Sequence, residues 1–234
     1  MTANNEAGTM QPERELAALA HEYGALFHTD AVQAAGHTDV DVSASGVDLM
    51  TVSAHKFGGP KGAGFLYIKK GVLPDKLIEG GHQERSMRGG TTNVAAVVGM
   101  AEAFALSAAE MERNNALAAA AKDAFAGHVI SNVPDVRENC ASSPRLPHIV
   151  NFTFFGVNGD ALVQSLDLAG IACSLGSACS SGSLEPSHVL TAIGMPESEA
   201  RSSVRFSFGP GVTVDDAVYA AGVLADTVRR LRGR

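Results

Sequence analysis

Apolar positions in the first part of the chain follow a helical spacing once and then an extended spacing three times. In 13–23, Leu16, Leu19 and Tyr23 recur at helical intervals, and Gly24 follows as a C-terminal cap, so the pattern predicts a short amphipathic helix. Short apolar runs at 25–30, 47–53 and 64–68 predict strands. Strands that alternate with a helix predict an α/β layered architecture.

The rest of the chain predicts a second, smaller unit. Residues 93–128 are rich in Ala, Leu, Met and Glu and predict a long helix, with a break expected near Ser107 or Asn114. Strands are then expected at 149–155 and 204–208, and helices at 160–169, 186–193 and 215–232. We therefore expect a partial large domain over 1–110 and a small α+β C-terminal domain over 111–234.

Composition narrows the classes of partner. The 234 residues have a formal net charge of −7 without a long run of one sign, which argues against direct nucleic-acid binding. No uninterrupted apolar run reaches the length of a membrane span, so we expect no membrane partner. The three cysteines form no C-x-x-C pair, which argues against a structural metal site and favours a reducing, cytoplasmic location.

Several side chains that could bind a ligand lie close together at the end of the predicted strand 47–53. Ser53, His55 and Lys56 bring a hydroxyl, an imidazole and an ammonium into one turn, and the glycines of 58–64 allow a ligand to approach the backbone. Phosphate suits such donors. A solvated turn with an exposed lysine is the simpler interpretation, and a Walker loop is excluded because G-x-x-x-x-G-K-[ST] does not occur.

Asp30 favours a cofactor over the solvated turn. It ends the preceding predicted strand, so its carboxylate could meet a ring nitrogen held near Lys56, and Gln33 follows within reach of a ring hydroxyl. Pyridoxal phosphate needs a lysine and an acidic residue in these roles, because a protonated ring nitrogen draws electrons from the substrate. The sequence therefore predicts pyridoxal phosphate as the cofactor.

Several motifs together resemble the cysteine desulfurases, in the class V aminotransferase group of fold type I pyridoxal-phosphate enzymes. They run in family order from residue 4 to the last helix, and they are Asn4-Asn5-Glu6, His28-x-Asp30-Ala31-x-Gln33, Ser53-x-His55-Lys56, Gly80-Gly81-His82-Gln83-Glu84-Arg85 and Arg88-x-Gly90-Thr91. The resemblance implies a mostly parallel sheet with helices in the large domain.

The resemblance also implies residue roles. Lys56 matches the Schiff-base lysine and Asp30 the partner of the pyridine nitrogen, while Asn5 and Gln33 match contacts to the ring hydroxyl. Ser53 and His55 match phosphate ligands. Thr91 matches a residue that reaches the phosphate of the neighbouring subunit, which implies a homodimer.

A second set of residues matches the sulfur chemistry of that family. The small, polar loop around Cys179 resembles the loop of the catalytic cysteine, whereas Cys140 and Cys173 are expected to be structural. Arg205 matches the arginine that binds the substrate carboxylate, with Asn5 beside it. The implied reaction converts L-cysteine to L-alanine and leaves the sulfur on Cys179 as a persulfide for an iron–sulfur scaffold or a tRNA-thiolation enzyme.

Family members have a further N-terminal segment that contains a phosphate-binding loop and a histidine that stacks on the ring. We therefore expect this chain to be an N-terminally truncated part of a longer protein, with an incomplete sheet that exposes strand edges and apolar side chains. Two alternatives remain: another class V enzyme, such as a selenocysteine lyase or an aminotransferase, and an inactive fragment that only binds other proteins.

Overall fold

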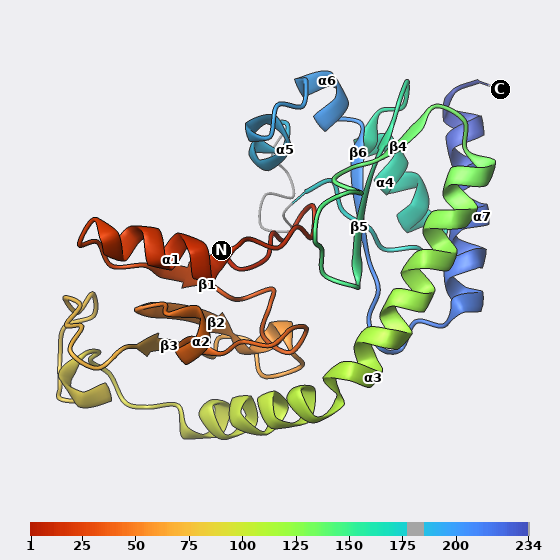
Figure 1. Cartoon of the computed structure of the whole chain (residues 1–234). Coiled ribbons are helices and arrows are strands. Elements are labelled where there is room, and N and C mark those ends of the chain that lie inside the picture. The colour runs from red at the N-terminus through yellow and green to blue at the C-terminus, as the bar shows by residue number, and fades with distance from the viewer. Residues whose placement is uncertain (177–184, 234) are drawn as a thin grey trace. The chain divides into compact units, whose positions relative to one another are not determined.

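The computed structural model describes residues 1–176 and 185–233 and divides into two compact units (Figure 1). The first unit contains Met1–Ala3 and Gln11–Met111, and the second contains Asn4–Met10 and Glu112–Arg234. The division falls inside the long helix α3 (Val94–Asn132), and the short segment Asn4–Met10 groups with the C-terminal part of the chain.

A three-stranded sheet forms the centre of the first unit, in the order β1 (His28–Asp30), β2 (Leu49–Ser53), β3 (Gly64–Ile68). The strands β1 and β2 are parallel, and β3 is antiparallel to β2. Helix α1 (Glu13–Glu22) precedes the sheet, and the one-turn helix α2 (Val42–Ser45) lies between β1 and β2 in the chain. Two 3₁₀ turns follow, η1 (Ala54–Lys56) and η2 (Glu84–Ser86).

Asp48 is the buried acidic residue that joins these elements just before β2. Its carboxylate accepts hydrogen bonds from the backbone N–H of Phe27 at 2.9 Å and from Lys69 Nζ at 3.0 Å, and it pairs with His21 Nε2 of α1 at 2.7 Å. Burial alone would raise the pKa of Asp48, but these hydrogen bonds and the charge of His21 outweigh burial and lower the pKa to about 2.

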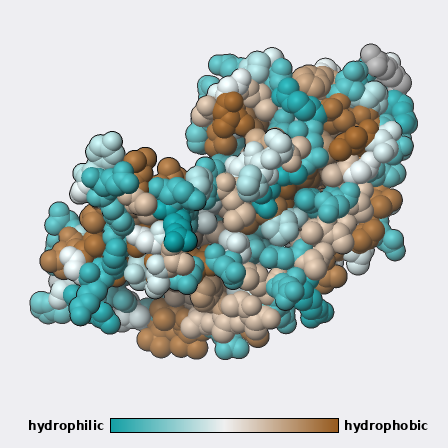
Figure 2. Space-filling view, in the orientation of Figure 1, coloured by the Kyte–Doolittle hydropathy of each residue, from teal (hydrophilic) through white to brown (hydrophobic). Residues whose placement is uncertain are grey.

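The first part of α3 packs on the first unit through a few residues. The ring of Phe104 meets those of Phe57 and Phe65 edge-on, with centroids 5.3 Å and 6.1 Å away. Other apolar side chains of this stretch, such as Val94 and Val98, are exposed, and Figure 2 shows hydrophobic residues over the beginning of α3. By length and composition alone α3 could cross a membrane, a test that packed helices of globular proteins also pass.

Exposed apolar side chains also occur elsewhere in the first unit. They include Leu19 of α1, Tyr23 directly after it and Leu66 of β3. In a complete domain such surface is normally covered by further chain, because burial of apolar area is the main driving force of folding. This finding agrees with the expected incomplete sheet.

The second unit contains an antiparallel sheet in the order β4 (Val136–Glu138), β5 (Ile149–Phe154), β6 (Ser203–Ser207). Its helices besides the second part of α3 are α4 (Gly159–Leu168), α5 (His188–Ala192), α6 (Glu197–Ala200) and α7 (Val214–Leu231). Phe125 of α3 lies against Phe206 of β6 and Phe208, with ring centroids 4.7 Å and 5.4 Å apart. This core includes Leu162 of α4 and Leu224 of α7.

Most predicted elements are present, with local differences. The break expected in the long helix is wrong, because α3 runs without interruption through Ser107 and Asn114. The strand predicted from residue 25 begins only at His28, since the N–H of Ala25 still donates to the carbonyl of Ala20 in α1. The sequence patterns did not predict β4, α2 or α6, which are only three or four residues long.

Candidate active site

Two parallel strands of the first unit end at the same edge of the sheet with polar residues. Asp30 is the last residue of β1 and pairs in register with Thr51, while Ser53 is the last residue of β2. The turn η1 follows Ser53 directly and contains His55 and Lys56. The strand ends of a parallel pair are a common position for functional side chains, and here they gather four of the predicted cofactor ligands.

Asp30 is partly buried, and only one of its two carboxylate oxygens accepts a hydrogen bond from a described residue. Its Oδ1 accepts a hydrogen bond from the backbone N–H of Val32 at 2.8 Å, which starts the turn that contains Gln33. Among the described residues, Oδ2 of Asp30 has no hydrogen-bond partner, and neither does the side chain of Gln33. Both side chains thus keep free polar atoms at the edge of the sheet.

The turn that contains Lys56 is fixed by its backbone. The N–H of Gly59 donates to the carbonyl of Ala54 at 2.9 Å, and the N–H of Ala54 donates to the carbonyl of Ala63 at 3.0 Å. A Cβ at position 59 would lie 2.9 Å from the Cβ of Ala54, so this close approach requires glycine. The side chains of His55 and Lys56 are exposed on this turn, without a hydrogen bond or ion pair to any described residue.

Pyridoxal phosphate suits the groups present at this edge. An amine, an imidazole, a hydroxyl and a carboxylate with a free oxygen all come from one unit, and they match the Schiff-base, phosphate and ring-nitrogen partners that the cofactor needs. The remaining predicted ligand of the first unit, Thr91, is exposed in the segment that precedes α3.

In the second unit, the strands β5 and β6 have one polar and one apolar face. Successive side chains of a strand point to opposite faces, so Val150, Phe152 and Phe206 enter the core while Asn151 and Arg205 lie on the other face. Asn151 and Arg205 are directly opposite each other in the ladder. The apolar face of the sheet packs against the core, and Arg205 lies on the opposite, polar face.

The guanidinium of Arg205 has one edge occupied and one edge free. Its Nη1 donates to the backbone carbonyl of Asn5 at 2.6 Å. Among the described residues, its buried Nε has no hydrogen-bond partner, and neither does its Nη2. The Nε and Nη2 atoms form a fork that binds a carboxylate through two hydrogen bonds. Burial lowers the pKa of Arg205, while the negative charge of Glu6 acts in the opposite direction.

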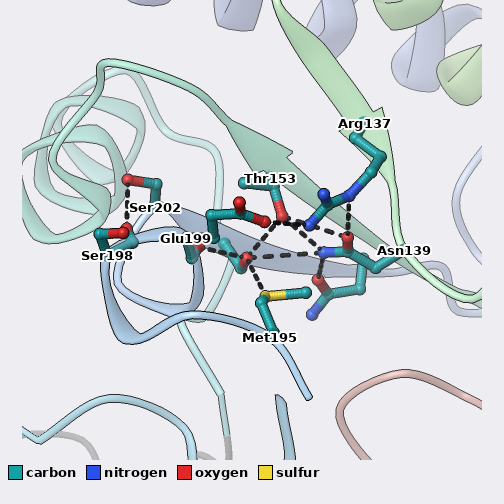
Figure 3. Close-up of polar contacts among 9 residues, drawn as sticks. Arg137, Asn139, Thr153, Met195, Ser198, Glu199 and Ser202 are labelled. Carbon is teal, nitrogen blue, oxygen red and sulfur yellow. Dashed lines mark hydrogen bonds and ion pairs between the residues drawn. The ribbon is translucent and has the colours of Figure 1, made fainter. Parts of the chain in front are cut away.

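A network of buried polar side chains supports this face of the sheet (Figure 3). Asn139 Nδ2 donates to Asn151 Oδ1 at 2.7 Å and to Thr153 Oγ1 at 2.9 Å, and the hydroxyl of Thr153 lies 2.8 Å from that of Ser203. The hydroxyl of Ser203 in turn donates to the carbonyl of Glu199 at 2.8 Å. Because buried polar groups need such partners, this network fixes the three strands in one register.

The predicted catalytic cysteine, Cys179, lies within 177–184 and therefore outside the residues that the structure describes. The other two cysteines are partly buried. Burial raises the pKa of Cys140, although Arg145 opposes this, and burial raises the pKa of Cys173 to about 12, helped by the charge of Asp167. Both thiols therefore form little thiolate at neutral pH.

Each unit thus holds its own part of the predicted set. The first contains Asp30, Gln33, Ser53, His55, Lys56 and Thr91, and the second contains Asn5 and Arg205. No role is predicted from the sequence for Glu6, Asn151 or Ser187, although Glu6 lies in the motif Asn4-Asn5-Glu6. In the described residues, no group of three potential ligands could hold a metal ion.

Comparison with known proteins gives the chain a family context. The model of the "Aminotransferase class-V" family matches residues 1–219. The cysteine desulfurase IscS of Dictyoglomus turgidum is 47% identical over 232 residues, which are 99% of this chain and 59% of that protein. A putative cysteine desulfurase, IscS 1 of Bacillus subtilis, is also 47% identical, with 61% of its length covered.

Solved structures show the same fold. A NifS-like protein from Rickettsia africae superposes with a TM-score of 0.88 at 30% identity, over 100% of this chain and 61% of that protein. The structure described as SspA in complex with cysteine gives a TM-score of 0.72 at 35% identity, over 89% of this chain and 57% of that protein. These likenesses confirm the expected α/β fold class. The chain spans about three fifths of the length of these proteins.

Proposed function

The chain belongs to the class V aminotransferase family, and on that premise we propose that it forms part of a pyridoxal-phosphate-dependent cysteine desulfurase. The observation that supports this most directly is the free Nε and Nη2 edge of Arg205, which suits the carboxylate of an amino acid. The relatives described as cysteine desulfurases share the sequence along almost the whole chain.

In this proposal the cofactor is bound by the predicted ligands of the first unit and by Asn5, which groups with the second unit. Lys56 holds it covalently, Asp30 pairs with its ring nitrogen through the free oxygen, and Gln33 and Asn5 contact the ring hydroxyl. Ser53 and His55 bind its phosphate. When bound, the cofactor withdraws electrons from the α-carbon of the substrate.

Arg205 and Cys179 act on the substrate, L-cysteine. Arg205 binds its carboxylate through two parallel hydrogen bonds and so orients the substrate sulfur. The thiolate of Cys179 attacks that sulfur, so that a new S–S bond forms as the C–S bond of the substrate breaks. The electron pair of the broken bond remains on the carbon skeleton, which takes up a proton and leaves as L-alanine. The persulfide of Cys179 is then available to an acceptor.

The setting of this reaction is part of the same proposal. The small number of cysteines suits a cytoplasmic protein, and Thr91 is proposed to reach the cofactor phosphate of a second copy in a homodimer. The sulfur acceptor is proposed to be an iron–sulfur scaffold or a tRNA-thiolation enzyme. Each of these is a protein that accepts sulfur from a persulfide.

The deciding experiment compares three cysteine variants. The purified chain, and a version extended to the length of its relatives, are supplied with pyridoxal phosphate, L-cysteine and a thiol, and alanine and sulfide are measured. Cys179→Ser is expected to abolish both products, whereas Cys140→Ser and Cys173→Ser keep them, because burial holds these two thiols protonated. If the extended Cys179→Ser protein made as much sulfide and alanine as the wild type, the proposal would be wrong.

A further inference from the structure

The most deeply buried acidic side chain of the second unit is that of Glu6, which is only 2% exposed. Three contacts fix its position. Its Oε2 accepts a hydrogen bond from the Ser187 hydroxyl at 2.5 Å, its N–H donates to Asn4 Oδ1 at 2.8 Å, and its carbonyl accepts from Asn151 Nδ2 at 3.3 Å. Burying a carboxylate is costly, so a residue held in this way needs a compensating interaction.

The compensating charge is that of Arg205. The negative charge of Glu6 raises the pKa of the Arg205 guanidinium against the effect of burial. No ion pair of Arg205 occurs among the residues that the structure describes, so Glu6 acts across space and does not occupy a donor of the guanidinium. Asn5, the neighbour of Glu6, binds Nη1 through its backbone carbonyl. The Nε and Nη2 edge therefore stays free while the charge is balanced.

We propose that Glu6 is a positioning residue for Arg205. Its buried carboxylate stabilises the partly buried guanidinium in the orientation that leaves the Nε and Nη2 edge available to a carboxylate ligand. The hydroxyl of Ser187, which also caps the first turn of α5, holds the Glu6 carboxylate in place. The role rests on the proposed function only in taking Arg205 as the ligand of the substrate carboxylate.

A second contact of the carboxylate supports this role. A Cβ at Gly176 would lie 3.0 Å from Glu6 Oε2, so the chain at Gly176 lies directly against the carboxylate. The preceding Ser174 exchanges two backbone hydrogen bonds with Arg205, at 2.6 Å and 3.1 Å. Glu6 thus contacts the chain at Gly176 and at Ser187, and the first of these stretches is bonded to the backbone of Arg205 itself.

The proposal is tested by the exchange of a single proton. In the ¹⁵N-labelled chain, the signal of the Arg205 Nε–H is assigned by its loss in Arg205→Lys, and its rate of exchange with water is measured by NMR at mildly acid pH. Glu6→Gln keeps the size of the side chain and removes its charge. It is expected to speed this exchange about tenfold or more, because the guanidinium loses its counter-charge and opens to water.

Three further variants separate positioning from general stability. Ser187→Ala is expected to speed the exchange several-fold, Ser187→Thr to restore the wild-type rate because it keeps the hydroxyl, and Glu197→Gln, at an exposed residue of α6, to have no effect. The thermal unfolding midpoint is recorded for each. An unchanged exchange rate of the Arg205 Nε–H in folded Glu6→Gln would overturn the proposal. Equal exchange rates in Ser187→Ala and Ser187→Thr would also overturn it. The comparison of these two variants is decisive if Glu6→Gln does not fold.

This measurement needs neither cofactor nor turnover. An extended protein that made no alanine or sulfide would refute the proposed function, while the exchange rates would still report whether Glu6 positions Arg205. Conversely, unchanged exchange rates in an active enzyme would remove the role of Glu6 alone.

Discussion

Asn151 and Arg205 lie directly opposite each other in the β5–β6 ladder, and both are tied to the N-terminal segment Asn4–Met10. Asn151 Nδ2 donates to the carbonyl of Glu6 at 3.3 Å, and Arg205 Nη1 donates to the carbonyl of Asn5 at 2.6 Å. Two neighbouring carbonyls of one segment thus bind two neighbouring strands. The position of Arg205 depends on this pair of contacts.

Replacement of Asn151 should destabilise the second unit. Asn151→Ala leaves the buried carbonyl of Glu6 without its donor and removes one of the acceptors of Asn139 Nδ2, which costs about 1–3 kcal/mol. Urea unfolding followed by circular dichroism measures the loss. Asn132→Ala, at an exposed residue that bonds only within its own helix, is the matched control and should cost less than about 0.5 kcal/mol. Equal losses in the two variants would contradict the structural role of Asn151.

Lys56 should be the lysine that binds pyridoxal phosphate covalently. After incubation with the cofactor and reduction with borohydride, mass spectrometry of peptides should find the label at Lys56 in the wild type. Lys56→Ala should lose both this label and the visible absorbance of the bound cofactor, because alanine has no amine to form the covalent bond. Lys61→Ala, an exposed lysine of the same loop, should keep both. An absorbance that persists in Lys56→Ala would rule out the assignment.

Arg205→Lys should weaken the binding of L-cysteine. A lysine ammonium cannot supply two parallel hydrogen bonds from one planar group, and a hydrogen bond to a charged group contributes about 1.5–3 kcal/mol. The KM of the cofactor-loaded protein for L-cysteine should therefore rise by about tenfold or more. Arg229→Lys, on the surface of α7, should leave KM unchanged. A normal KM in Arg205→Lys would show that the substrate carboxylate binds elsewhere.

Asp48 should make the first unit sensitive to acid. Its pKa is lowered to about 2 in the folded protein from an ordinary value of 3.8, so its contribution to stability is present above the ordinary pKa and is lost as the pH falls towards 2. Asp48→Asn should therefore be less stable at neutral pH and should lose less further stability between pH 5 and pH 2. Thermal unfolding at several pH values measures this. Asp75→Asn, at an exposed residue, is the control, and identical pH profiles of Asp48→Asn and wild type would refute the prediction.

Sequence patterns predicted the elements that repeat an apolar spacing over several residues. The strand Gly64–Ile68 has the predicted bounds, and the helices α1, α4 and α7 begin and end within a few residues of the prediction. The strand β4 was missed because its three residues, Val-Arg-Glu, contain only one apolar side chain, and its place in the sheet comes from pairing with β5. Such pairing is a tertiary effect.

In the candidate site, too, some features follow from the local sequence and others from tertiary contacts. The positions of Asp30 and Ser53 at strand ends follow from the local sequence, because a strand and its last residue are local features. The free edge of Arg205 does not, since it depends on a carbonyl that lies 200 positions away in the chain. The buried state of Glu6 likewise depends on Ser187, 181 positions away. Only the three-dimensional structure reveals these contacts.

The grouping of Asn4–Met10 with Glu112–Arg234 has a consequence for folding during synthesis on the ribosome. This segment is synthesised before the strands of the first unit, whereas Asn151, Ser187 and Arg205 are synthesised much later. The strands β1, β2 and β3 can pair before the partners of that segment in the second unit have been synthesised. Contacts between residues far apart in the chain form later, because they require a large loss of chain entropy. The Asn4–Met10 segment would therefore stay exposed to chaperones that bind nascent chains, and the Nε and Nη2 edge of Arg205 would form only after β6 has been synthesised.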